Sequence, residues 1–247
     1  MEPLSGYDLL AGVIIFAAHL VSAVTGFGAN VLGLPLLALV VGLVPGKQGL
    51  VVQSVLLSLY LSARWRRRVD RKQLRYILAV AGAGLIVGMF LFEVLPPRGS
   101  AIVLAAFVIA VALRGLFNLA PTFRAPPWLA RLMLFLGGVV HGALTTGGPL
   151  LVIYCRRAMP HKSVFRATLA VMWLALAIGL MAGWTISGSW DAATPRVVLV
   201  GLPFLLAGLV AGEYLHHRVD EARFGMLVNV TLAAVGAVLL VSSLRGQ

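Results

Sequence analysis

YILAVAGAGLIVGMFLF, residues Tyr76–Phe92, is an apolar stretch without a single charged side chain. A helix rises about 1.5 Å per residue, so roughly 20 such residues span the hydrocarbon core of a bilayer. Similar runs recur along the whole chain, at about 9–25, 31–44, 48–63, 74–95, 100–119, 129–144, 149–159, 163–186, 196–216 and 224–243. The sequence therefore predicts an all-α, polytopic membrane protein.

The composition supports the same class. Of 247 residues, 60% are hydrophobic and 11% are charged, whereas a soluble domain carries about 25% charged residues. The net charge is +12, but the basic residues stand between apolar runs, where they contact anionic lipid and set orientation. We therefore expect no nucleic-acid partner, and we expect the lipid bilayer to be the surroundings of the chain, in the inner membrane.

The first residues and the single cysteine bear on whether the chain has a signal peptide, a disulfide or a metal cluster. Met1–Leu4 has no basic start of a signal peptide, so we expect the first apolar run to belong to the mature protein. Cys155 is the only cysteine, which excludes an internal disulfide and a cysteine-based metal cluster. We expect neither a cofactor nor a metal ion.

Two halves of five apolar segments each, 1–122 and 123–247, share landmarks in the same order. The shared landmarks are Gly84 and Gly88 with Gly208 and Gly212, Pro45-Gly46-Lys47 with Pro160-His161-Lys162, Gln53 with Thr168, and Gly26-Phe27-Gly28 with Thr146-Gly147-Gly148. Four matches in one order predict an internal duplication.

The Lys and Arg residues predict an orientation. They crowd the loop at 64–72, which should be cytoplasmic. If each short segment returns to the side from which its predecessor started, the loops at 120–131, 156–166 and 216–223 are also cytoplasmic. Only Lys47, Arg98, Arg196 and Arg245 then lie outside. Both termini are then periplasmic and the two halves are inverted, as in many secondary transporters. The alternative is parallel halves with four spans each.

Glycine- and threonine-rich breaks interrupt the first and the sixth run. Broken backbone at membrane depth must be buried in protein or line a wet cavity. A helix that begins after a break presents N–H groups and a partial positive charge, which suit an anion. The alternative is that these small residues only allow close helix packing. The candidate substrate-binding residues are Thr25, Gly26, Phe27, Gly28, Asn30, Gln53, His141, Thr145, Thr146, Gly147, Gly148 and Thr168.

Among these candidates, His141 is the histidine deep in the second break. A polar side chain inside a membrane is costly unless it has a partner, so His141 is expected to bind a substrate oxygen or carry a proton. It could instead bond a backbone carbonyl freed by the break. Gln53 and Thr168 either bind substrate or join helices. No acidic residue lies at the centre of a predicted span, which favours an anionic substrate over a cationic one.

The two breaks also resemble a known family. Gly26–Pro35 is similar to the first glycine-rich motif of the TauE/SafE sulfite exporter family, and Thr146–Val152 is similar to its second copy. The chain departs from that pattern at Ala29, Asn30 and Ile153, and at Thr145-Thr146, where the second motif starts. The resemblance implies transport of sulfite, sulfonates or related small anions.

We therefore expect a secondary transporter that moves a small sulfur-containing or carboxylic anion by alternating access, with the two breaks facing each other near the midplane. A proton or sodium ion could be coupled to it. An anion channel is the alternative with the same site chemistry. An intramembrane enzyme is the remaining alternative, although the sequence holds neither a Gly-x-Ser-x-Gly nor a His-Glu-x-x-His motif.

Overall fold

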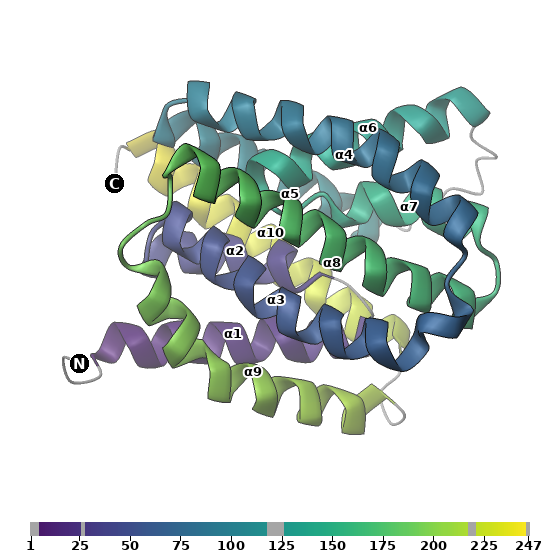
Figure 1. Ribbon diagram of the computed structural model, residues 1–247. Helices are drawn as coiled ribbons and strands as arrows, with labels where there is room; N and C mark the ends of the chain where they lie inside the picture. Colours follow the sequence, from purple (N-terminus) through teal and green to yellow (C-terminus); the bar gives the residue numbers. More distant parts are fainter. Residues whose placement is uncertain (1–4, 26–27, 118–125, 217–220, 246–247) are drawn as a thin grey trace. The chain divides into compact units, whose positions relative to one another are not determined.

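The computed structural model describes residues 5–25, 28–117, 126–216 and 221–245. Over these residues the chain forms ten α-helices and one short 3-10 helix (Figure 1). They are α1 Gly6–Thr25, α2 Ala29–Val40, α3 Leu43–Trp65, η1 Arg66–Arg68, α4 Arg71–Val94, α5 Pro97–Leu116, α6 Pro127–Leu144, α7 Gly148–Ala158, α8 Lys162–Ser187, α9 Thr194–His216 and α10 Glu221–Arg245. Within the described residues, seven helices are long and apolar enough to cross a membrane. The predicted all-α, polytopic class is therefore confirmed.

Proline, glycine and aspartate set several helix ends. Pro97 and Pro127 stand in the first turns of α5 and α6, where a missing N–H costs no helical hydrogen bond. Gly188 ends α8 in the left-handed conformation with a φ of 65°. Asp70 caps α4, because its Oδ1 accepts hydrogen bonds from the amides of Lys72 and Gln73 at 3.0 and 2.9 Å.

The two segments expected to be short are short helices. α2 has 12 residues and α7 has 11, and each follows one of the breaks. The position of Lys47 differs from the expectation. Lys47 was expected in a loop outside the membrane, but α3 already begins at Leu43 and the Lys47 side chain is 2% exposed. Pro45 fits the first turn of α3, so the helix starts before the lysine and carries it into the protein.

The chain forms two compact units, and each draws on both halves of the sequence. The first comprises Met1–Leu50, Leu95–Arg124 and Asp191–Gln247, and the second comprises Val51–Val94 and Ala125–Trp190. The helix pairs described below each lie within one unit.

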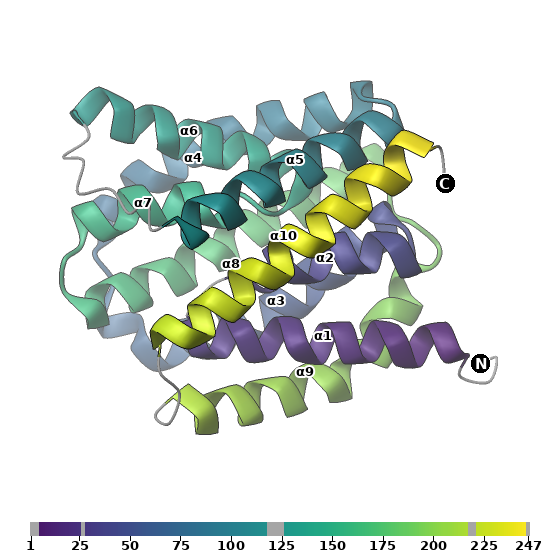
Figure 2. The same ribbon diagram turned by 180° about the vertical axis from the view of Figure 1, so that it is seen from behind.

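In the first unit, α1 and α9 run side by side in the same direction (Figures 1 and 2). A Cβ added at Gly208 of α9 would lie 2.5 Å from the carbonyl oxygen of Phe16, and one at Gly212 would lie 2.6 Å from the Cβ of Ala23. The numbers of the contacting residues increase together along both helices, so the N-termini of α1 and α9 lie at the same end of this unit.

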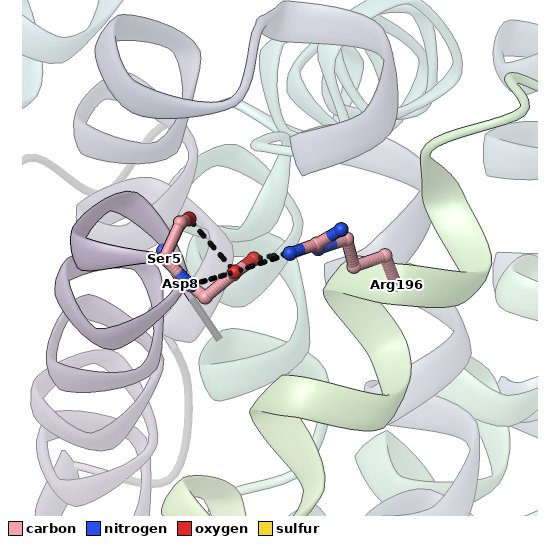
Figure 3. Close-up of polar contacts among 3 residues, drawn as sticks. All are labelled: Ser5, Asp8 and Arg196. Atoms are coloured by element: carbon pink, nitrogen blue, oxygen red, sulfur yellow. Dashed lines mark hydrogen bonds and ion pairs between the residues drawn. The ribbon is translucent and has the colours of Figure 1, made fainter. Parts of the chain in front are cut away.

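An ion pair joins these two N-termini (Figure 3). Arg196 donates from Nε to Asp8 Oδ1 at 3.0 Å and from Nη2 to Asp8 Oδ2 at 2.7 Å. Ser5 and Asp8 form a reciprocal capping box: the Ser5 amide donates to Asp8 Oδ2 at 2.7 Å, and the Asp8 amide donates to Ser5 Oγ at 3.3 Å. The hydrogen bonds that cap α1 thus also position the Asp8 carboxylate for its ion pair with Arg196.

A second helix pair of the first unit, α5 and α10, is antiparallel (Figure 2). Arg98 at the start of α5 donates to the carbonyl oxygen of Leu244 at the end of α10. Further along α5, Gly115 lies against the side chain of Asn229, which is near the start of α10. The residue numbers of the contacting residues therefore fall along α10 as they rise along α5, so the two helices run in opposite directions.

In the second unit, α4 and α6 make the closest helix contact, and they run in the same direction. A Cβ at Gly84 of α4 would meet the carbonyl oxygen of Phe135, and one at Gly88 would meet that of Val139. A Cβ at Gly142 of α6 would in turn meet the carbonyl oxygen of Leu85. Glycine at these positions is what lets the two backbones touch.

α8 also runs parallel to α4. Thr168 Oγ1 accepts a hydrogen bond from the amide of Asp70, just before α4, at 3.0 Å. Further along, Gly183 of α8 lies against the side chain of Met89. The starts of α4, α6 and α8 therefore lie at one end of the second unit.

That end carries every Lys and Arg of the second unit. The end of α7 is there too, since the Tyr154 hydroxyl donates to Gln73 Oε1 at 3.3 Å and its ring lies 5.8 Å from that of Tyr76. The basic residues gathered at this end are Arg64, Arg66, Arg67, Arg68, Arg71, Lys72, Arg75, Arg131, Arg156, Arg157, Lys162 and Arg166.

Candidate functional site

The second break is a sharp reversal between α6 and α7 in the second unit. α6 ends at Leu144, and the next residue, Thr145, is left-handed with a φ of 57°. The Thr145 amide donates to the carbonyl oxygen of His141 at 2.8 Å, which closes the last turn of α6. A β-branched residue rarely adopts this conformation, and holding one there costs about 1–3 kcal/mol. The surrounding packing must compensate for that strain.

Two glycines let the break fold back on α6. A Cβ at Gly147 would meet the carbonyl oxygen of Gly137 and would lie 2.8 Å from the Cβ of His141. A Cβ at Gly137 would lie 2.9 Å from Cγ of Leu151, in α7. Any larger residue at either position would push α7 off the last two turns of α6. These contacts support the close-packing alternative for Gly147, while substrate binding by Gly147 stays a prediction.

Two polar side chains at this reversal each have a buried atom without a hydrogen-bond partner, although the His141 ring also hydrogen bonds with the backbone of Thr145, as its helix-end alternative expected. His141 is 6% exposed and Thr146 is 0% exposed. Among the described residues, neither Nδ1 of His141 nor Oγ1 of Thr146 has a partner. The His141 ring lies 5.3 Å from the ring of Trp173, in α8. Leaving a buried polar group unpaired costs about 1–3 kcal/mol, so both atoms would gain from a bound ligand that offers oxygen atoms.

The first turn of α7 has fewer free amide donors for an anion than the sequence predicted for a helix that begins after a break. Pro149 has no N–H, and the amides of Leu150 and Leu151 both donate to the carbonyl oxygen of Gly147 at 3.2 Å. The donors that this helix start can offer a ligand therefore come from Gly148 and the residues just before it. The partial positive charge at the helix N-terminus is unaffected by this change and still suits an anion.

The first break belongs to the first unit. α1 ends at Thr25, and Gly28 precedes α2 with a φ of 105°, a conformation that favours glycine. Asn30 stands half-buried in the first turn of α2. Gly26, Phe27 and the side chain of Thr25 lie outside the described residues. The expectation that the two breaks line one pocket stays a prediction.

The two candidates outside the breaks, Gln53 and Thr168, are both fully buried in the second unit. Thr168 uses its hydroxyl as the acceptor for the Asp70 amide at 3.0 Å, which fixes the start of α4 to α8. It stands five residues before Trp173, about 8 Å along the helix axis. This hydrogen bond supports the helix-joining alternative for Thr168, while substrate binding by either residue stays a prediction.

Sequence reasoning missed the aromatic neighbour of the second break. Trp173 lies in the middle of a long apolar run, where nothing in the sequence distinguishes it from other core residues. Its ring covers His141 from α8. Within the described residues, no group of three or more His, Cys, Asp or Glu side chains is placed to hold a metal ion.

Comparison with known proteins assigns the chain to a family. The model of the family described as Sulfite exporter TauE/SafE matches residues 10–239, nearly the whole chain. The chain belongs to the TauE/SafE sulfite exporter family. The two motifs on which the resemblance rested, Gly26–Pro35 and Thr146–Val152, are the two breaks and the starts of the short helices that follow them.

A curated relative of this TauE/SafE protein is also a membrane protein. The chain is 27% identical over 175 residues, which are 69% of this chain and 72% of the relative, to the "Probable inner membrane transporter protein TsaS" of Comamonas testosteroni. No solved structure matches the chain. With its seven apolar helices, this TauE/SafE protein is a multi-pass membrane protein of a transporter family.

Proposed function

We propose that this TauE/SafE protein is a secondary transporter for a small sulfur-containing or related carboxylic anion in the inner membrane. The anion would be sulfite, an organosulfonate or a carboxylate of similar size. The observation that carries the proposal is the pair of buried, unpartnered polar atoms at the second break, His141 Nδ1 and Thr146 Oγ1. The family description supports a sulfur-containing anion, and the name of the Comamonas relative supports transport across the inner membrane.

The chemistry of the second break suits an oxyanion. A sulfonate or sulfite group has three oxygen atoms, each of which accepts hydrogen bonds, and a hydroxyl and an imidazole can donate to two of them. The start of α7 adds a favourable partial charge. Hydrogen bonds to a charged acceptor contribute about 1.5–3 kcal/mol each, so neutral donors alone give the anion a binding site.

Alternating access is the mechanism we propose for transport. Many secondary transporters are built from inverted repeats whose broken helices meet the substrate near the midplane. The sequence landmarks of the two halves and the break in each half are the features that support this mechanism here. An anion channel would use the same binding chemistry but would not need two alternating states.

Transport by purified protein in liposomes tests the proposal. We would measure uptake of sulfite, methanesulfonate, isethionate, sulfoacetate, acetate and succinate, with choline and putrescine as cationic controls. We expect saturable uptake of at least one sulfur-containing anion, together with counterflow, in which unlabelled anion inside the vesicle accelerates entry of labelled anion. Uptake of cations alone would refute anion transport. Flux without saturation or counterflow would identify a channel.

A further inference from the structure

His141 is the ionisable side chain at the reversal between α6 and α7, where glycines, the Trp173 ring and the backbone of Thr145 surround it and no charged side chain among the described residues is in contact with it. The neighbouring Gly142 packs on the backbone of Leu85, Gly147 packs on the Cβ of His141, and the Trp173 ring covers the imidazole. The ring is almost completely buried and its Nδ1 has no partner among the described residues. An imidazole in such surroundings is neutral when no ligand is bound, because an unpaired buried charge is very costly.

The other ionisable groups of the surrounding helices are distant from the break. Arg131 precedes His141 by ten residues on α6, roughly 15 Å along the axis, and Arg166 precedes Trp173 by seven residues, roughly 10 Å. Glu93 follows Leu85 by eight residues, roughly 12 Å. The complete set is Arg71, Lys72, Arg75, Tyr76 and Glu93 on α4, Arg131 on α6, Tyr154, Cys155, Arg156 and Arg157 on α7, and Lys162 and Arg166 on α8.

Within the described residues of the second unit, an anion that enters this break therefore finds no fixed positive side chain. The neutral donors would hold it, but its net charge would be buried without compensation. Only one group at the reversal can change its charge to match. A protonated imidazole would donate hydrogen bonds from both ring nitrogens and would bring the net charge of the occupied site to zero.

We propose that His141 takes up one proton when the anion binds, so that anion and proton cross the membrane together. This inference rests on the proposed function and names its coupling ion. The proton comes from water on the side where the anion enters and binds the lone pair of the neutral ring. The same proton returns to water when the anion leaves on the opposite side. No covalent bond of the substrate changes, and the loaded site is electrically neutral.

Proteoliposomes with a controlled pH gradient test this coupling. Methanesulfonate and isethionate are the probes, because they stay fully ionised and cannot carry the proton themselves. With the membrane potential clamped by potassium and valinomycin, each pH unit, acidic outside, should drive about tenfold accumulation of the anion. A pH dye inside the vesicles should report one proton entering per anion. In detergent, anion binding to the wild-type protein should take up one proton from a weakly buffered solution.

Two variants assign the coupling to His141. His141→Gln keeps a hydrogen-bond donor but cannot be protonated, so it should lose gradient-driven accumulation while still exchanging labelled for unlabelled anion. His19→Gln is the matched control: His19 is also buried, at 1% exposed, but its Nδ1 hydrogen bonds to the carbonyl oxygen of Ile15 at 2.9 Å. We expect His19→Gln to accumulate anion as the wild type does.

The outcomes separate coupling from transport. If wild-type protein exchanges these or other panel anions but ignores the pH gradient, and binding takes up no proton, the coupling is wrong and the proposed function stands. If His141→Gln still accumulates anion with the gradient, the proton is carried elsewhere and the assignment to His141 is wrong. If no anion of the panel moves at all, the proposed function and the coupling both fail.

Discussion

The hydroxyl of Thr146 behaves differently from those of Thr185 and Thr231, two threonines inside helices. Thr185 donates to the carbonyl oxygen of Met181 at 2.8 Å, and Thr231 donates to that of Leu227 at 2.9 Å, the usual arrangement for a threonine inside a helix. Thr146 stands between α6 and α7, and its Oγ1 has no hydrogen-bond partner among the described residues. Its buried hydroxyl is therefore open to a ligand, although the chain keeps it away from water.

We predict that Thr146→Val weakens anion binding about tenfold, because one hydrogen bond to a charged acceptor is lost, worth roughly 1–3 kcal/mol. Valine has nearly the shape of threonine, so the fold should be retained. Half-saturation in the liposome uptake assay measures the effect. Thr146→Ser restores the hydroxyl and should bind nearly as the wild type does, and Thr231→Val, on α10, should leave binding unchanged. Equal affinity of Thr146→Val and wild type would remove Thr146 from the site.

At the level of helices, contacts between backbones hold each unit together. Lipid is as apolar as leucine, so helices in a bilayer gain little from burying apolar side chains and associate through close packing of small residues. The α4–α6 pair and the α1–α9 pair both follow this rule, with Gly84 and Gly88 in one and Gly208 and Gly212 in the other. These are the glycines that the sequence comparison of the two halves paired, and each pair packs against the helix that precedes a break, α6 in one case and α1 in the other.

The α4–α6 contact predicts a large difference between two neighbouring glycines. A Cβ at Gly84 would meet the backbone of α6, whereas a Cβ at Gly82 has nothing within 4 Å. Gly84→Ala should therefore destabilise the protein by about 1–3 kcal/mol through overpacking, and Gly82→Ala should be neutral or slightly stabilising because alanine favours the helix. Thermal unfolding in detergent measures both. A similar loss in the two variants would contradict the packing described for α4.

The Asp8–Arg196 pair predicts a coupled but small effect on stability. Arg196 is partly exposed, so solvent screens the pair and its contribution is modest. Asp8→Asn and Arg196→Gln should each lower the unfolding temperature by at most a few degrees, and the double variant should lower it by less than the sum of the two. Additive losses would show that the two side chains act independently and that the contact in Figure 3 contributes no coupling.

For the whole molecule, helix directions bear on the arrangement of the two halves. α5 and α10 are the fifth segments of their halves, and a parallel duplication would make them run in the same direction. They run antiparallel in the first unit, which favours the inverted arrangement. The second unit has all of its Lys and Arg at one end, as the positive-inside rule expects of a cytoplasmic face. Inversion and orientation stay predictions until labelling tests them.

Single cysteines on a Cys155→Ser background give that test. Arg67→Cys, at the basic end of the second unit, should react with a membrane-impermeant maleimide only from the cytoplasm, and Ser189→Cys, after the end of α8, only from the periplasm. Gly6→Cys should also react only from the periplasm, because the expected topology places the N-terminus there. A reaction of residue 6 from the cytoplasm alone would refute the inverted topology, and residues 67 and 189 reacting from one side would refute the span of α8.

The membrane class, the helices and the resemblance to the family could all be predicted from the sequence. Each of the ten apolar runs became a helix, because apolar length is a local property and a bilayer leaves the backbone no other way to satisfy its hydrogen bonds in a lone segment. The breaks could also be predicted, since glycine, threonine and proline within an apolar run indicate where a helix ends. The polar residues of the second break could therefore be named as candidates before any coordinates were known.

Which buried side chains have partners depends on how the helices pack in three dimensions. Thr168 was found bonded to the amide of Asp70, Lys47 was found inside the protein rather than in a loop, and Asp8 was found paired with Arg196 far along the chain. Nδ1 of His141 and Oγ1 of Thr146 have no partner among the described residues, and Trp173 lies over the imidazole. Such pairings depend on which helix faces reach close contact, and that is set by glycines meeting distant backbones, which no local pattern of residues specifies.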